Sequence, residues 1–186
     1  MIVKLSKRPV AAKHGAILNT ALTLFLHWEF SDVSVKQIIS AAGMSKGVFY
    51  RCYANKNELL LDLLMDEVFH MDQWVLNHQD FETSAKLVKM YFLEIGRHLG
   101  RYQLHQKIES YLEMSEPELF LVFKKWKKQH SLWVKHQLLN KDNKLDLLYA
   151  QLWAMLEGCA RLQNHQHFQH LCSRKHPFEV FVRNMI

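Results

Sequence analysis

The sequence contains few of the residues that interrupt regular secondary structure. Only six of its 186 residues are glycine and three are proline, and no rhythm of short strands and turns is visible, which argues against an all-β fold. Hydrophobic residues make up 49% of the chain, enough for a sizeable core and too many for global disorder. Because the apolar residues recur at helical spacing, we expect an all-α protein.

Cysteines and long apolar runs are also scarce. Cys52, Cys159 and Cys172 do not form the paired spacing of a disulfide framework, so a reducing cytoplasm is the expected location. No apolar run approaches the roughly 18 residues of a membrane span, and the N-terminus lacks the apolar stretch of a signal peptide. We therefore predict a soluble cytoplasmic protein without a membrane partner.

Motifs that carry enzymatic chemistry are missing as well. The sequence has no glycine-rich phosphate loop, no G-x-S-x-G and no H-E-x-x-H, and these patterns mark nucleotide sites, serine hydrolases and zinc peptidases. We expect no enzyme and no cofactor.

Positive charge is concentrated in the N-terminal third. Residues 1–56 hold eight Lys or Arg and two acidic residues, whereas the other 130 residues hold 16 of each kind. The whole net charge of +6 therefore lies in the first 56 residues. Such a distribution favours a polyanionic partner for this third of the chain over an evenly solvated basic surface.

The stretch from Ser34 to Lys56 has the pattern of two short helices around a glycine turn. Ser34 and Gln37 form a capping box at the start of the first helix. Gly43 is suited to the positive φ of the turn, and the Ser45 hydroxyl is expected to cap the second helix. This order is the helix-turn-helix arrangement. We expect the exposed positions of the second helix to be Lys46, Gly47, Tyr50 and Arg51, which suit a phosphate-lined groove.

The flanking segments complete a small helical domain. Met1 to Arg8 has the composition of a basic arm, and Pro9 suits the first turn of a helix that runs to about Trp28. Asn55 and Glu58 form a second capping box, from which a long helix runs to about Leu76. We predict a helix-turn-helix DNA-binding domain over residues 1–60. The long helix joins it to a helical regulatory and dimerisation domain over residues 61–186.

The C-terminal region has the periodicity of several more helices, over residues 83–99, 101–114, 115–139, 145–162 and 178–185. Ser115 and Glu118 form a capping box, with Pro117 in the first turn. Aromatic side chains of this region are candidates for an apolar ligand pocket, although an ordinary core explains them equally well. The candidates are Trp74, Tyr91, Phe92, Trp126 and Trp153.

Two further clusters have both a functional and a structural explanation. The segment with His165, His167, His170, Cys172 and His176 matches no closed zinc pattern, so we favour surface histidines and predict no metal. The lysines around Trp126 could form a second basic patch, but a solvated helix face is the preferred interpretation. They are Lys124, Lys125, Lys127 and Lys128.

Residues from about Lys13 to Leu60 resemble the DNA-binding domain of TetR-family bacterial transcriptional regulators. The resemblance rests on Ile17, Ala21, Phe25, Phe30, Ser34, Val35, Ile38, Ala42, Gly43, Met44, Ser45, Gly47, Phe49, Tyr50, Tyr53, Lys56 and Leu59. Two positions depart from the family pattern, namely Glu29 in place of glycine and Ile39 in place of alanine. Neither faces the groove in the implied arrangement.

The resemblance implies roles for individual residues. Ser34, Tyr50 and Lys56 match positions that contact phosphates, and Ser45 belongs to the same DNA-binding set. Positions that approach base edges or the groove floor are matched by Lys36, Lys46, Gly47, Val48 and Cys52. Phe49 and Tyr53 are expected in the small core instead.

The resemblance also implies a homodimer that binds a palindromic operator, with the interface on the helix from Leu145 to Leu162 and the Phe178 segment. A two-fold pair reads two half-sites, whereas one recognition helix reads too few bases for useful specificity. We expect a repressor that a small-molecule effector releases from double-stranded DNA. The alternative is an architectural or nucleoid-associated DNA-binding protein without an effector.

Overall fold

A computed structural model describes residues 11–78, 83–139, 145–162 and residue 182. These residues form helices and no strand, which confirms the all-α prediction. The helices are α1 (Ala11–His27), α2 (Val35–Ala41), α3 (Lys46–Cys52), α4 (Lys56–Asn77), α5 (Ser84–Arg97), α6 (Leu99–Ser115), α7 (Pro117–Leu139) and α8 (Leu145–Leu162). In the described part of the chain, no helix is both long and apolar enough to cross a membrane. The predicted arm at residues 1–8, Pro9, and the predicted final helix except Val182 lie outside the described residues.

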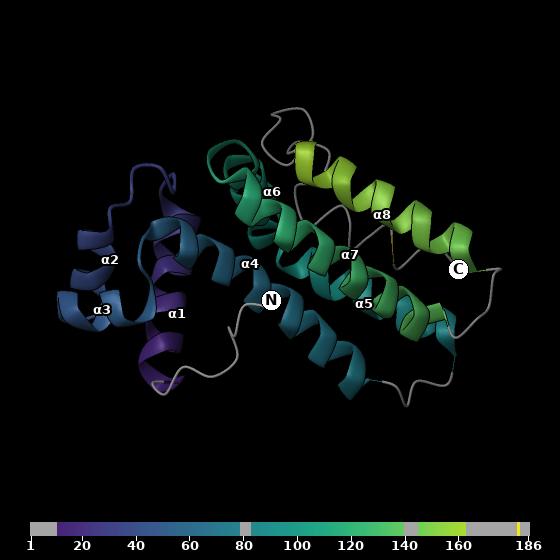
Figure 1. The fold of residues 1–186 in the computed structure, drawn as a ribbon. Helices are drawn as coiled ribbons and strands as arrows, with labels where there is room; N and C mark the ends of the chain where they lie inside the picture. Colours follow the sequence, from purple (N-terminus) through teal and green to yellow (C-terminus); the bar gives the residue numbers. More distant parts are fainter. Residues whose placement is uncertain (1–10, 79–82, 140–144, 163–181, 183–186) are drawn as a thin grey trace.

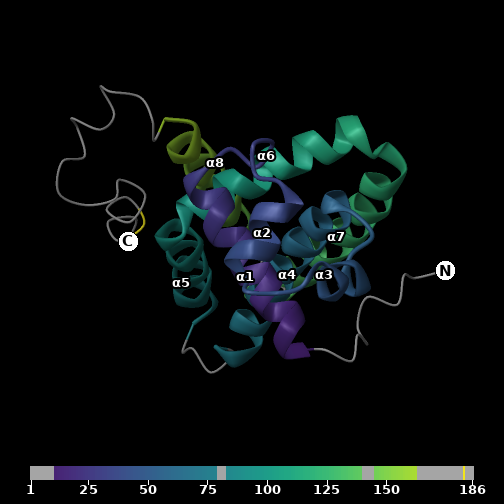
Figure 2. The same cartoon turned by 90° about the vertical axis from the view of Figure 1, so that its left-hand side faces the viewer.

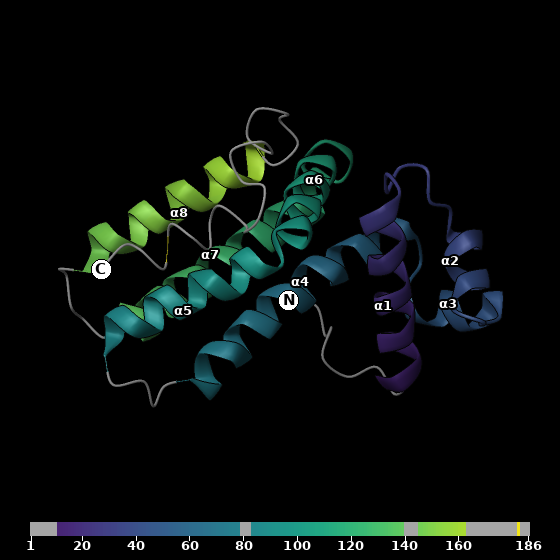
Figure 3. The same ribbon diagram turned by 180° about the vertical axis from the view of Figure 1, so that it is seen from behind.

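The helices form two groups that α4 connects. α1, α2 and α3 pack together at one end of the molecule, and α4 runs from them beneath the remaining helices (Figure 1). Seen from behind, α5, α7 and α8 lie side by side, and α6 stands between them and α1 (Figure 3). When the α1–α3 end faces the viewer, α2 and α3 lie in front of α4 (Figure 2).

The helix ends in the first group follow from local sequence. The Ser34 hydroxyl accepts from the Gln37 N–H at 3.2 Å, and the Gln37 side chain accepts from the Ser34 N–H at 2.7 Å, which confirms the capping box. Gly43 has a φ of 63°, as expected. At the start of α4 the Asn55 side chain accepts from the Glu58 N–H at 2.9 Å. The Glu58 carboxylate, however, accepts from Ala54 and not from Asn55.

Two predicted caps are wrong. Ser45 is the N-cap residue of α3, but its side chain makes no cap hydrogen bond. The backbone carbonyl of Ser45 accepts from the Val48 N–H at 3.0 Å instead. Ser115 is the last residue of α6, and its hydroxyl donates to the Tyr111 carbonyl at 2.9 Å. It therefore cannot cap α7, which begins at Pro117.

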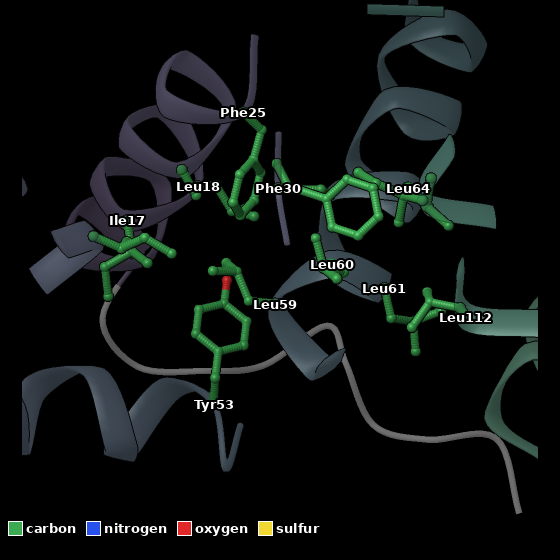
Figure 4. Packing of buried hydrophobic residues seen from close by; sticks show 14 of the residues in the cluster. Ile17, Leu18, Phe25, Phe30, Tyr53, Leu59, Leu60, Leu61, Leu64 and Leu112 are labelled. Atoms are coloured by element: carbon green, nitrogen blue, oxygen red, sulfur yellow. The ribbon is translucent and has the colours of Figure 1, made fainter. Parts of the chain in front are cut away.

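The buried side chains form two clusters, and the first extends beyond the predicted DNA-binding domain. Figure 4 shows Phe25 and Phe30 packed against Leu60 and Leu64 of α4, with Leu112 of α6 beside them. Leu104, Ile108, Phe120 and Phe123 belong to the same cluster. The second cluster joins the end of α4 to α5, α7 and α8. The predicted boundary at residue 60 thus lies inside α4, and the hydrophobic core continues across it.

Candidate nucleic-acid interface and cavity

The helix-turn-helix is held in place by one carboxylate on α4. Asp62 Oδ2 lies 2.6 Å from His14 Nε2 of α1 and accepts from the Tyr53 hydroxyl at 2.8 Å. The His14 and Tyr53 rings stack with their centroids 5.5 Å apart. Asp62 therefore connects α1, the end of α3 and α4. The sequence does not indicate this contact, because His14 and Asp62 are 48 positions apart.

The outer face of α3 is open to solvent as predicted. Lys46, Gly47, Tyr50 and Arg51 are all exposed. Phe49 and Tyr53 are 0% and 1% exposed and lie in the core, which confirms their assignment. The Lys46 ammonium lies 5.7 Å from the centre of the Tyr50 ring. This face therefore presents two cations and an aromatic hydroxyl next to a residue with no side chain.

Gly47 has no structural need to be glycine within this chain. A Cβ added at this position would meet no atom within 4 Å, and its φ is not positive. Glycine in a helix costs stability relative to alanine. The open space beside Gly47 faces away from the core, on the same face as Lys46 and Tyr50.

The other predicted DNA-contacting residues are less uniform. Ser34 and Lys36 at the start of α2 are exposed, as is Ser45, whereas Val48 is half-buried. Cys52 is only 5% exposed and belongs to the first core cluster. Its thiol cannot reach a base edge while the domain is folded, so the expected groove contact by Cys52 is wrong. α3 turns this position inward because Cys52 follows Phe49 by three residues on the same helical face.

Lys56 makes a contact that the sequence did not predict. Its ammonium donates to the Phe30 carbonyl oxygen and lies 5.9 Å and 6.0 Å from the centres of the Phe25 and Phe30 rings. Burial lowers the pKa of Lys56, and the nearby Asp32 carboxylate opposes this shift. In this position Lys56 joins the α1–α2 loop to the start of α4. A phosphate contact would require the ammonium to turn outward.

A cavity of about 390 Å³ lies among α4, α5, α6, α7 and α8. Of the five aromatic candidates for a ligand pocket, Tyr91 and Trp153 line it. The other three stand one layer behind, each against a lining ring. Trp74 packs on Tyr91 with centroids 6.0 Å apart, Phe92 packs on Trp153 at 5.2 Å, and Trp126 packs on His130 at 4.1 Å.

The cavity also contains buried polar groups that sequence analysis missed. Asp72 is 7% exposed, and its Oδ2 lies 2.5 Å from His130 Nδ1. Burial raises the pKa of Asp72, against the opposing effect of His130. Burial, together with the positive charges of Arg101 and Lys127, lowers the pKa of His105 to about 4. His105 is therefore a neutral lining residue at physiological pH.

Within the residues that the structure describes, no three His, Cys, Asp or Glu side chains are grouped so that they could hold a metal ion. The histidine-rich segment at 165–176 lies outside them.

A comparison with protein-family models matches residues 17–63 to the bacterial regulatory proteins of the tetR family. The match begins in α1 and ends in α4, so it contains α2, α3 and the Asp62 contact that holds them. Residues 17–63 are thus similar to the DNA-binding domain of TetR-family regulators. This domain makes the chain a DNA-binding transcriptional regulator, with its DNA-binding helices at the N-terminal end. A search of curated proteins finds no match to the chain.

Proposed function

We propose that this regulator is a repressor that binds a palindromic operator as a homodimer and leaves it when a small molecule fills the cavity. The observation that carries this proposal is that α4 and α6 each contribute both to the cavity wall and to the core of the DNA-binding domain. One part of each helix lines the cavity, and another part belongs to the core of the DNA-binding domain.

On α4 the two uses follow each other along the helix. Leu59, Leu60 and Leu63 are buried with the DNA-binding helices, whereas Met71 and Asp72 line the cavity about two to four turns later. A rigid helix transmits a displacement at one end to the other.

On α6 the two uses lie on different faces of the helix. Tyr102, His105 and Glu109 line the cavity, while Leu104 and Ile108 are buried against the DNA-binding core. α6 also touches the α1–α2 loop, because Lys107 Nζ lies 2.8 Å from Glu29 Oε1 and the Tyr111 and Phe30 ring centroids are 5.1 Å apart. Glu29, which departs from the family pattern, thus contributes to this contact.

A ligand that fits the cavity in only one position of α6 would shift the orientation of the DNA-binding helices. The ligand can change the free-energy difference between the two orientations by no more than the difference between its binding free energies for them.

At the DNA, we propose that α3 enters the major groove. Lys46, near its N-terminal end, would donate to guanine O6 and N7, and Gly47 would let the backbone approach the groove floor. Tyr50 and Ser34 would contact phosphates, with Lys36, Ser45 and Val48 at the edges of the same surface. Lys56 would join them only after leaving the Phe30 carbonyl.

For the homodimer, α8 offers an exposed face. Leu147 is 67% exposed and Leu162 is 45% exposed. Ala150 and Ala154 lie between them and are also exposed, and a Cβ at Gly158 would meet nothing within 4 Å. Small residues at helical spacing allow close approach of a second helix, and these observations support pairing of α8 with its counterpart.

Selection of bound sequences from a random DNA pool, at two stated salt concentrations, tests the proposal. We expect a palindromic consensus with half-sites about one helical turn or a multiple apart. Enrichment of dispersed sequences without symmetry would instead favour the architectural protein. Sedimentation of Ala154→Arg, with Gln129→Arg on the exposed side of α7 as control, tests the interface. Only Ala154→Arg is expected to give monomers.

A further inference from the structure

One residue of the cavity wall, Asp72, has a carboxylate oxygen that the folded chain does not satisfy. Asp72 Oδ1 is buried and has no hydrogen-bond partner among the described residues. The other oxygen of the same carboxylate is occupied by His130. A buried acceptor without a partner costs free energy, and a charged one costs more. Asp72 lines the cavity, so a ligand there can supply the missing donor.

We propose that the cavity binds an organic cation, a protonated amine on an apolar body, with its ammonium group against Asp72 Oδ1. This inference rests on the proposed function, because it names the chemical class of the effector.

The other carboxylates of the cavity wall already have partners. Glu109 pairs with Lys127, Glu67 lies 3.7 Å from Arg101, and Glu157 lies 3.4 Å from Arg161. Among these four carboxylates, Asp72 is the one with a buried oxygen that has no hydrogen-bond donor among the described residues. The Asp72 carboxylate would repel an anionic ligand at Oδ1, whereas an ammonium group would form a charge-assisted hydrogen bond there.

The walls around Asp72 suit the rest of such a molecule. Tyr91, Tyr149 and Trp153 contribute aromatic rings to the cavity, and the faces of aromatic rings attract cations. Burial raises the pKa of Tyr91, so its hydroxyl stays neutral. Leu64 and Val134 supply apolar surface. The volume of about 390 Å³ is within the range of small-molecule sites.

A neutral ligand with a hydroxyl group could also donate to Asp72 Oδ1. The experiment must therefore distinguish the effect of the ligand's positive charge from that of a hydrogen bond alone. Three compounds with one skeleton do so: 4-phenylbutylamine, 4-phenylbutan-1-ol and 4-phenylbutyrate carry an ammonium, a hydroxyl and a carboxylate group. Isothermal titration of the full chain at neutral pH, without DNA, measures their affinities. We expect the amine to bind at least about tenfold more tightly than the alcohol, and the carboxylate most weakly.

Asp72→Asn removes the charge and keeps the shape. We expect it to reduce the preference for the amine over the alcohol to within about twofold. Asp66→Asn is the matched control, because Asp66 lies on the same helix, pairs with His70 and does not line the cavity. It should keep the preference of the parent protein.

Equal binding of amine and alcohol, stronger binding of the carboxylate, or no binding of the amine would each overturn the proposal. So would an unchanged preference in Asp72→Asn. If that variant fails to fold, the three compounds on the parent protein still decide. DNA selection is carried out without ligand, so a failure here leaves the DNA-binding proposal intact, and the reverse also holds.

Discussion

Replacing Gly47 by alanine should strengthen the fold and weaken DNA binding. Gly47 is the second residue of α3, and an added Cβ meets no atom of the chain within 4 Å. Alanine in a helix is about 0.5–1 kcal/mol more favourable than glycine. For a protein of this size 1 kcal/mol corresponds to about 2–4 °C, so the melting temperature should rise by about 1–4 °C.

DNA binding should change in the opposite direction. If the α3 backbone approaches the groove floor at Gly47, the new methyl group occupies space that bases or backbone atoms of DNA need. We expect at least about a tenfold loss of operator affinity, equal to about 1.4 kcal/mol. The number of phosphate contacts should stay the same, so the salt dependence of binding should not change. Fluorescence anisotropy with the selected operator at several salt concentrations measures both quantities.

Gly100→Ala is the matched control. Gly100 is likewise exposed and the second residue of its helix, and an added Cβ meets only Leu26 Cδ2 at 4.0 Å. It should stabilise the protein similarly without lowering operator affinity. If Gly47→Ala is more stable yet binds the operator as the parent does, the proposed close approach of α3 is refuted.

Three further predictions concern single side chains. Lys46→Ala should cost about 1–3 kcal/mol on the selected operator and relax specificity at one base pair, as a repeated DNA selection would reveal. Lys56→Met should lower the free energy of unfolding by about 1–3 kcal/mol, because the Phe30 carbonyl loses a charged donor. If the salt dependence of DNA binding by this variant also falls by about one in slope, Lys56 contacts a phosphate in the complex. The pKa of His105 is lowered to about 4 in the folded protein but is about 6.5 in the unfolded chain. As pH falls below 6.5 the unfolded chain therefore binds a proton that the folded protein does not, and the folded protein loses stability. Urea unfolding should therefore show a loss of about 2–3 kcal/mol between pH 6.5 and pH 4 that His105→Gln reduces.

Helix ends could be predicted where the deciding contact lies within one turn. Ser34 and Gln37 are three residues apart and cap α2 as expected. The predicted capping box of Ser115 was wrong although its possible partners are equally near in sequence. The Ser115 hydroxyl has two possible local partners, and it donates to the Tyr111 carbonyl at the end of α6. Sequence spacing does not rank such alternatives, because the preceding helix competes for the same side chain.

Helical periodicity was enough to predict which side chains of α3 are exposed and which are buried. Lys46 and Tyr50 are exposed, and Phe49 is buried, as their spacing implied. Cys52 was misplaced because a family position does not state which way a side chain near the end of a helix points. The contact of Lys56 with the Phe30 carbonyl could not be predicted, because the two residues are 26 positions apart.

The helical class, the basic N-terminal third and the position of the glycine turn could all be inferred before the fold was known. These properties depend on composition, on periodicity and on contacts between residues up to four positions apart. Two other features depend on long-range packing: the DNA-binding core continues into α6 and α7, and Asp72 contacts His130, 58 positions away. A cavity is what packed helices leave unfilled, so it depends on how five of them meet and not on the pattern of any one.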